Sequence, residues 1–212
     1  MTSDTLPRGE VAYQQLFNAI KTGILKPGSR ITETEIADMF GISRTPVRDA
    51  IRRLESAGLV IHIPRQGAVI KKLDHREIIE MYEMREVLEG TAALHAAQHA
   101  SDLEIDEMTE LNELMLSNKT NAPAAAEANA QFHKTLYRAA NNRYLIDAIN
   151  NLSSVMALLD GTTLYNEERV ETAYKEHADI IVQIRSRDGK AANETVRNHI
   201  RNSQRVRIRM FR

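Results

Sequence analysis

The most regular hydrophobic pattern of the chain lies between residues 42 and 60, in ISRTPVRDAIRRLESAGLV. Apolar residues recur there at i, i+3, i+4 and i+7, which predicts a helix with one buried face. Thr45 is a good N-cap, Pro46 suits a first helical position and Gly58 is a natural stop, so we expect a helix from Thr45 to Gly58. The apolar positions are Val47, Ala50, Ile51 and Leu54.

The opposite face of this predicted helix is rich in arginine. Most of these arginines recur every fourth residue, and only Asp49 and Glu55 dilute their charge. A helix face that is merely solvated usually mixes charges of both signs for i,i+4 pairing, so we interpret this face as one that meets an anionic partner. The arginines are Arg44, Arg48, Arg52 and Arg53.

The first 72 residues contain short elements of mixed type. Residues 32–35 have the spacing of a capping box, and residues 41–43 form a tight turn before the arginine-bearing helix. Helix, helix, turn, helix and hairpin is the order of a winged helix-turn-helix, which we predict for residues 1–72. The other expected elements are helices Val11–Thr22 and Glu33–Phe40, and strands Leu59–Ile63 and Ala68–Lys71, which Pro64 to Gly67 join.

Residues 73–212 show only helical periodicity. This pattern predicts an all-α helical bundle as a second domain, so we expect a mainly α protein with an N-terminal winged helix-turn-helix. The expected helices are His75–Ala100, Asp102–Asn118, Ala124–Ala140, Arg143–Asp160, Glu167–Arg187 and Asp188–Met210.

Composition narrows the possible chemistry. The chain has 212 residues, 42% of them hydrophobic, which is enough for a buried core. Zero cysteines exclude disulfides, thiolate zinc sites and cysteine nucleophiles, so a metal site would use His, Asp, Glu or Asn. No apolar run approaches the ~18 residues of a membrane span, and the N-terminus lacks a signal-peptide layout, so we expect no membrane partner and a cytoplasmic location.

The net charge of −1 hides the local positive patch between residues 44 and 53. Arginine can fork onto guanine or onto phosphate oxygens, and Ser43 and Thr45 at the helix start can donate to phosphate. Arg65 and Gly67 at the hairpin tip suit a wing that enters the neighbouring minor groove or rests on the backbone. We therefore expect double-stranded DNA as a partner.

These residues also carry a family resemblance. The N-terminal third resembles the GntR family of bacterial transcription regulators in LKPGSRI at 25–31, in EIA at 35–37, in GISRTPVRDA at 41–50 and in AGLV at 57–60. Gly67 stands where the wing glycine of the family belongs.

The resemblance implies that a defined set of residues contacts operator DNA. Arg52 and Arg53 are added to this set from helix geometry rather than from the motif. The residues that the resemblance implies are Ser43, Arg44, Thr45 and Arg48, with Thr34 at the second helix and Arg65, Gln66 and Gly67 in the wing.

Three histidines occupy inward positions on three separate helices of the second domain. They are His133, His177 and His199, and Asn129 lies one turn before the first of them. Three imidazoles and an amide oxygen that face a bundle interior make a first shell for Zn²⁺, with Ni²⁺ or another divalent transition metal as alternatives. Each histidine could instead be a hydrogen-bonded core residue, because periodicity does not show that the three faces converge.

The helical half resembles the FCD effector domain of the FadR subfamily. In that family an Asp or Asn, a His four residues later and single histidines on two later helices bind a metal, which matches Asn129, His133, His177 and His199. Many members have Asp at the first position, so Asn129 removes one negative charge. His95 and His99 form a rival i,i+4 pair near a helix end, and we interpret them as surface residues.

Arg85 falls on the otherwise apolar face of the first bundle helix, and an inward arginine needs an anion. Glu89, one turn later, could supply that anion internally. The functional alternative is the carboxylate of a small organic acid, and the resemblance supports it, because FCD regulators commonly sense carboxylates.

The resulting hypothesis is a ligand-responsive, metal-containing transcriptional regulator, with a repressor favoured, that binds a roughly palindromic operator as a homodimer. A metal-dependent hydrolase is the first alternative, but HExxH, ExxH pairs, a Gly-rich phosphate loop and a nucleophile elbow are absent from the sequence. The second alternative is an architectural DNA-binding protein whose bundle is purely structural.

Overall fold

The computed structural model describes residues 7–159 and 161–211. The described chain divides into two compact units, which we treat separately. The first contains the residues up to Asp74 and a segment that begins at Ser153, and the second contains His75–Leu152 and the residues from Gly161 onward. The sequence placed the domain boundary at residue 72 and assigned no later segment to the first domain.

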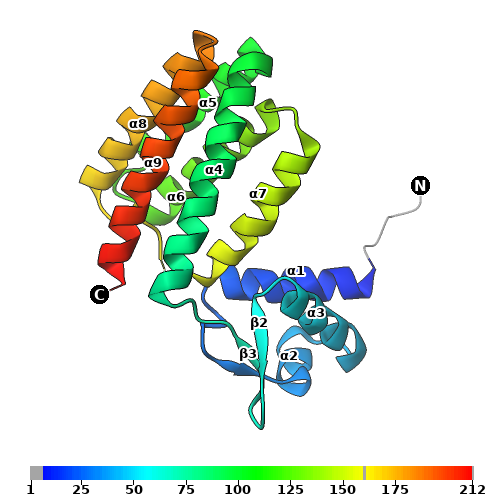
Figure 1. Cartoon of the computed structure of the whole chain (residues 1–212). Coiled ribbons are helices and arrows are strands. Elements are labelled where there is room, and N and C mark those ends of the chain that lie inside the picture. Colours follow the sequence, from blue (N-terminus) through cyan, green and yellow to red (C-terminus); the bar gives the residue numbers. More distant parts are fainter. Residues whose placement is uncertain (1–6, 160, 212) are drawn as a thin grey trace. The chain divides into compact units, whose positions relative to one another are not determined.

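The N-terminal unit has helices and a small antiparallel sheet (Figure 1). The strand order is β1-β3-β2, and Arg30 of β1 pairs with Val69 of β3. The sequence did not predict β1, because two residues are too few to show a strand period and only the tertiary pairing with β3 defines them. The elements are α1 (Arg8–Lys21), β1 (Arg30–Ile31), α2 (Glu33–Phe40), α3 (Arg44–Ser56), β2 (Val60–Ile63) and β3 (Gly67–Ile70).

The start of α2 confirms the capping box read from the sequence. The Thr32 side chain accepts from the Glu35 backbone N–H, and the Glu35 carboxylate accepts from the Thr32 backbone N–H. Gly41 ends α2 in the left-handed conformation, with φ 65°, which L side chains rarely adopt. This glycine therefore fixes the turn that leads into α3.

The helix α3 begins two residues earlier than the sequence predicted. Ser43 is its N-cap, without a side-chain capping bond, and Thr45 lies inside the first turn. The prediction of Thr45 as N-cap was wrong because the backbone N–H groups of a whole first turn lack helical partners, so Pro46 is tolerated at its third residue as well as at its first. The predicted apolar face is confirmed, since Leu54 is fully buried.

The second unit is helical, as the sequence predicted (Figure 1). The main difference lies in the fourth predicted helix, which ends at Val155 and continues as a 3-10 turn over Met156–Leu158, within the segment from Ser153 that belongs to the first unit. The predicted end of this helix, Asp160, lies outside the described residues. The helices are α4 (His75–His99), α5 (Asp102–Ser117), α6 (Ala122–Ala139), α7 (Arg143–Val155), α8 (Glu167–Arg185) and α9 (Gly189–Met210).

The helices of this unit pack closely around a core that includes Phe132 and Leu136, both fully buried. Helix α4 packs along α9, and α5 packs against α6 and α8. Gly90 allows the close approach of α4 to α9, because a Cβ atom at that position would lie 2.9 Å from Cγ of Arg197. Within the described ranges, no helix is both long enough and apolar enough to span a bilayer.

We predict that Gly41→Ala lowers the free energy of unfolding by about 1 kcal/mol, because alanine resists the left-handed conformation. Nothing lies within 4 Å of a Cβ built at Gly41, so the cost is conformational rather than steric. Gly9→Ala is the control, since Gly9 is helical with open space around it. Urea denaturation followed by circular dichroism measures both, and equal effects would contradict the prediction.

Candidate DNA interface and metal centre

The residues expected to contact DNA lie at the surface of the N-terminal unit. The side chains of Arg44 and Arg48 are 62% and 50% exposed, and Gly67 is partly buried. Arg52 lines one groove together with Arg48. The other exposed residues of the expected set are Thr34, Ser43, Thr45, Arg53, Arg65 and Gln66.

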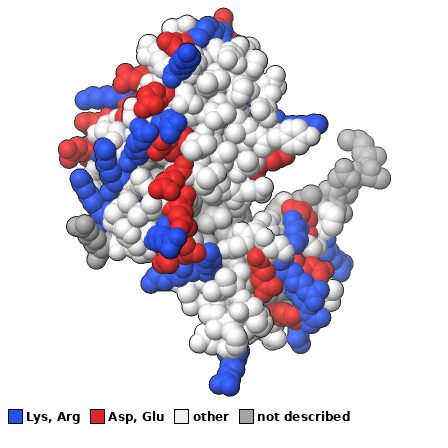
Figure 2. All heavy atoms as spheres, in the orientation of Figure 1, with Lys and Arg blue, Asp and Glu red and all other residues white. Residues whose placement is uncertain are grey.

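The arginine face of α3 is not free of carboxylates, which corrects the expectation from the sequence. Glu33 of α2 accepts from Arg48 Nε at 2.6 Å and Nη2 at 2.9 Å, and from Arg44 Nη2 at 3.3 Å. Figure 2 shows acidic atoms beside basic atoms over this part of the unit. The carboxylates come from other helices, so the sequence of α3 by itself could not reveal them.

Arg53 points to α1 rather than toward the other arginines. Its Nη1 donates to Glu10 Oε2 at 2.9 Å, and its guanidinium carbon lies 4.0 Å from the centre of the Tyr13 ring. Both contacts hold the charge against the domain's own first helix. We therefore place Arg53 outside the set proposed to read DNA, although helix geometry suggested it.

The hairpin between β2 and β3 has the strained backbone of a tight turn. Gln66 N donates to Ile63 O at 3.0 Å, which closes a four-residue turn with Arg65 at its third position. Arg65 has φ 67° and Gly67 has φ 84°. A non-glycine residue with positive φ costs on the order of 1 kcal/mol and is often found at functional sites. Arg65 is thereby exposed at the tip, as expected for a wing.

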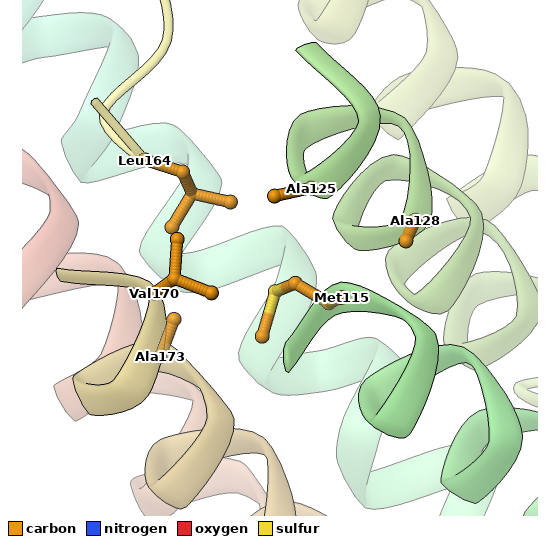
Figure 3. Packing of buried hydrophobic residues seen from close by; sticks show 6 residues of the cluster. All are labelled: Met115, Ala125, Ala128, Leu164, Val170 and Ala173. Atoms are coloured by element: carbon orange, nitrogen blue, oxygen red, sulfur yellow. The ribbon is translucent and has the colours of Figure 1, made fainter. Parts of the chain in front are cut away.

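In the helical unit, a packed apolar cluster holds α5, α6 and α8 together (Figure 3). Val170 and Ala173 on α8 lie one or two turns before His177, and Ala125 and Ala128 on α6 lie before His133. Because these side chains are buried between helices that lie side by side, residues further along α6 and α8 also come close together, and the rings of His133 and His177 have centroids 5.2 Å apart. Met115 of α5 and Leu164 complete the cluster.

The three predicted histidines meet. His133 of α6, His177 of α8 and His199 of α9 each offer one ligand nitrogen, and these atoms all lie within 4.8 Å of one another. The residues are 6%, 0% and 4% exposed. Asn129, the fourth expected ligand, is partly buried one turn before His133 on α6.

Two of these imidazoles have a hydrogen-bonding partner at Nδ1, and the third has a carboxylate beside it. His199 Nδ1 lies 2.8 Å from Glu176 Oε2, and His177 Nδ1 lies 3.2 Å from Asn112 Oδ1. His133 Nδ1 lies 3.2 Å from Glu89 Oε2 but makes no hydrogen bond there. Such outer partners fix the tautomer and ring orientation of metal-binding histidines, and they leave Nε2 as the ligand atom.

The Nε2 atoms fit a shared cation. His177 Nε2 is buried without a hydrogen-bond partner, and Nε2 of His199 lies 3.3 Å from Nε2 of His133. If both rings carry the proton on Nδ1, the two Nε2 atoms carry lone pairs and face each other unfavourably unless a cation lies near both. A proton on one of the two Nε2 atoms would instead make this contact a hydrogen bond. Burial lowers the pKa of His177 and of His199, which keeps both rings neutral at pH 7, as metal ligation requires.

Arg85 is buried and pairs with Glu89, which was the internal alternative left open by the sequence. Arg85 Nε donates to Glu89 Oε1 at 2.7 Å, and the Tyr137 hydroxyl donates to Glu89 Oε2 at 2.6 Å. Burial by itself raises the pKa of Glu89, but Arg85 and His133 outweigh it and hold that pKa well below its usual range. Glu89 thus connects the arginine to a predicted metal ligand.

Sequence reasoning missed several residues around the histidines. Asn112 was identifiable in principle, because it interrupts the buried face of α5 formed by Ile105, Met108 and Met115. Glu176 and Arg169 gave no such signal. Arg169 is 8% exposed, its Nη1 donates to Glu176 Oε2 at 3.3 Å, and its Nε is buried without a partner.

His95 and His99 do not join the three-histidine group. Their rings stack on each other with centroids 6.2 Å apart, and they line a shallow surface groove with Tyr144. His95 is partly buried and His99 is exposed, in line with the expectation that the pair lies near the surface.

Both units match known family models. Residues 8–70 match "Bacterial regulatory proteins, gntR family" and residues 80–202 match the FCD domain. The chain therefore belongs to the GntR family of bacterial regulators and carries an FCD domain in its helical unit. Its function is that of a DNA-binding transcriptional regulator.

Relatives and solved structures agree with this assignment. The chain is 32% identical over 193 residues to the regulator YdhC of Bacillus subtilis, covering 88% of this chain and 85% of that protein. It is 30% identical over 209 residues to a probable D-xylose utilization operon repressor of Paenarthrobacter nicotinovorans, and the match covers 94% of this chain and 89% of that protein. The fold matches that of E. coli McbR/YncC with a TM-score of 0.83 at 19% sequence identity, and the match covers 98% of this chain and 100% of that one.

We predict that Glu89→Ala lowers the free energy of unfolding by about 3–5 kcal/mol, because it leaves Arg85 buried without its carboxylate. Glu80→Ala is a matched control, since Arg76 Nε and Glu80 Oε1 form an ion pair with the same 2.7 Å distance and i,i+4 spacing on the same helix, but with side chains 87% and 54% exposed.

The control should cost less than about 1 kcal/mol, as exposed pairs do. Chemical denaturation of both variants measures the difference. Equal denaturation midpoints for Glu89→Ala and Glu80→Ala would show that the buried pair does not stabilise the helical unit.

Proposed function

We propose that this protein is a ligand-responsive repressor that reads operator DNA with α3 and with the β2–β3 hairpin. The exposed arginines of α3, in a winged helix-turn-helix that belongs to the GntR family, carry this proposal. Arg44, Arg48 and Arg52 would contact base edges and phosphates. Phosphate contacts are assigned to Thr34, Ser43 and Thr45, and wing contacts to Arg65, Gln66 and Gly67.

The regulator would act as a homodimer in the cytoplasm. A single reading helix gives modest affinity, whereas two helices held at half-site spacing add avidity and double the sequence that is read. A roughly palindromic operator follows from the twofold symmetry of such a dimer.

Asn129, His133, His177 and His199 would hold one divalent transition metal, with Zn²⁺ favoured by the nitrogen ligands and Ni²⁺ as an alternative. The unpartnered Nε2 of buried His177 supports this assignment. A bound ion would supply open coordination positions for an oxygen ligand. We propose that this site serves sensing rather than catalysis, since the family and the relatives are transcriptional regulators.

The effector would be a small organic carboxylate. Two buried arginines, Arg85 and Arg169, lie next to the histidine cluster through Glu89 and Glu176. An effector carboxylate at Arg85 would compete with Glu89, whereas Arg169 Nε has no partner to displace. A relative from Bacillus licheniformis, 31% identical over 144 residues, is named as a gluconate operon repressor, and gluconate is a hydroxy acid.

Arg48→Ala should abolish specific operator binding while the fold stays intact, because each Arg–guanine fork contributes about 1–3 kcal/mol and a dimer loses two. The probe is a duplex that the wild-type protein selects from a random-sequence pool, titrated by fluorescence anisotropy. Arg53→Ala is the control and should keep specific binding, since Arg53 is held against α1. Wild-type affinity in Arg48→Ala would refute the assignment.

Purified protein should carry about one divalent metal ion per chain, and His133→Ala with His177→Ala should remove it. The double variant His95→Ala with His99→Ala removes the same number of histidines and should retain the metal. Elemental analysis of the three proteins decides the question. A wild-type protein without metal, or equal metal content in both double variants, would reject the site.

A further inference from the structure

A carboxylate lies in the middle of the proposed DNA-reading face. Glu33 is the first residue of α2, and it accepts two hydrogen bonds from Arg48 and one from Arg44 on α3. The two arginines are one turn apart, so a single carboxylate contacts both. Phosphate would have to approach this surface against the charge of Glu33.

The pairing uses one particular edge of the Arg48 guanidinium. Glu33 Oε1 and Oε2 accept from Nε and Nη2, at 2.6 and 2.9 Å, which is the side edge of the planar group. Nη1 and the second proton of Nη2 form the end edge, and that edge remains available. Two parallel donors at the end edge match the O6 and N7 acceptors of guanine in the major groove.

Stability does not explain this arrangement. The side chains of Arg48 and Glu33 are 50% and 26% exposed, and exposed ion pairs usually add little to the free energy of unfolding. The hydrogen bond from Arg48 is the main reason that the pKa of Glu33 falls to about 2, so Glu33 is ionised throughout the neutral range. A permanent negative charge on a surface that must meet DNA therefore needs a functional reason.

We propose that Glu33 is a specificity-determining positioning residue: it holds Arg48 end-on for guanine and keeps phosphate away from the side edge of the guanidinium. The negative charge of Glu33 lowers the affinity for non-specific DNA. The two parallel donors that Arg48 directs at guanine raise the affinity for the correct base. Both effects widen the ratio between specific and non-specific binding. The inference rests on the DNA-reading role proposed for α3.

The test compares Glu33→Gln with wild type on two duplexes of equal length: the one that wild type selects from a random pool, and a scrambled version. Glu33→Gln keeps the size but removes the charge, so Arg44 and Arg48 become free for phosphate. The affinity for the scrambled duplex should rise, and the ratio of the two affinities should fall about tenfold. The salt dependence of scrambled-duplex binding should steepen by roughly one phosphate contact per chain.

Two further variants separate positioning from charge. Glu33→Asp keeps the charge but shortens the side chain, so it should weaken binding to the selected duplex without strengthening binding to the scrambled one. Asp38→Asn makes the same charge change at an exposed residue of the same helix and should leave the ratio unchanged. Thermal unfolding checks that all variants remain folded.

An affinity ratio in Glu33→Gln equal to that of wild type, or an equal loss in Asp38→Asn, would overturn the inference while leaving α3 as the reading helix. A wild-type protein that enriches no sequence from the pool would instead overturn the reading role of α3 and the inference with it. A repeat selection with Glu33→Gln should show a weaker guanine preference at one position of each half-site.

Discussion

The burial of charged and polar side chains, each of which needs a partner, is the constraint on which the helical unit depends. Glu89 illustrates it, because one carboxylate accepts from Arg85 and Tyr137 and faces His133. On the other side of the histidines, Glu176 contacts His199 and is paired with Arg169. A buried charge that lost its partner would be costly, so these contacts help to fix the helices relative to one another.

The same partners give the proposed sensor a physical basis. Glu89 binds Arg85 with one oxygen and faces Nδ1 of His133 with the other. A carboxylate ligand that drew Arg85 away from Glu89 would therefore change the electrostatic environment of a metal-ligand candidate. Ligand and metal would then be coupled through one side chain, and their binding free energies would depend on each other reciprocally.

The N-terminal unit uses ion pairs for a different purpose. The pairs of Glu33 with Arg44 and Arg48 are exposed, so they add little stability, but they decide which edge of Arg48 can meet DNA. Burial thus separates the two roles of a carboxylate in this chain. Inside the helical bundle it holds the structure together, and on α2 it directs a neighbouring arginine.

Local patterns in the sequence determined most of the elements. The capping box placed α2 correctly from Glu33 to Phe40, and helical periodicity placed each histidine on an inward face, because both depend on residues within one or two turns. Only the tertiary structure decided that His133, His177 and His199 meet, that Glu89 satisfies Arg85, and that Glu33 reaches α3. Those contacts depend on rotation and packing of whole helices, which hydrophobic periodicity does not encode.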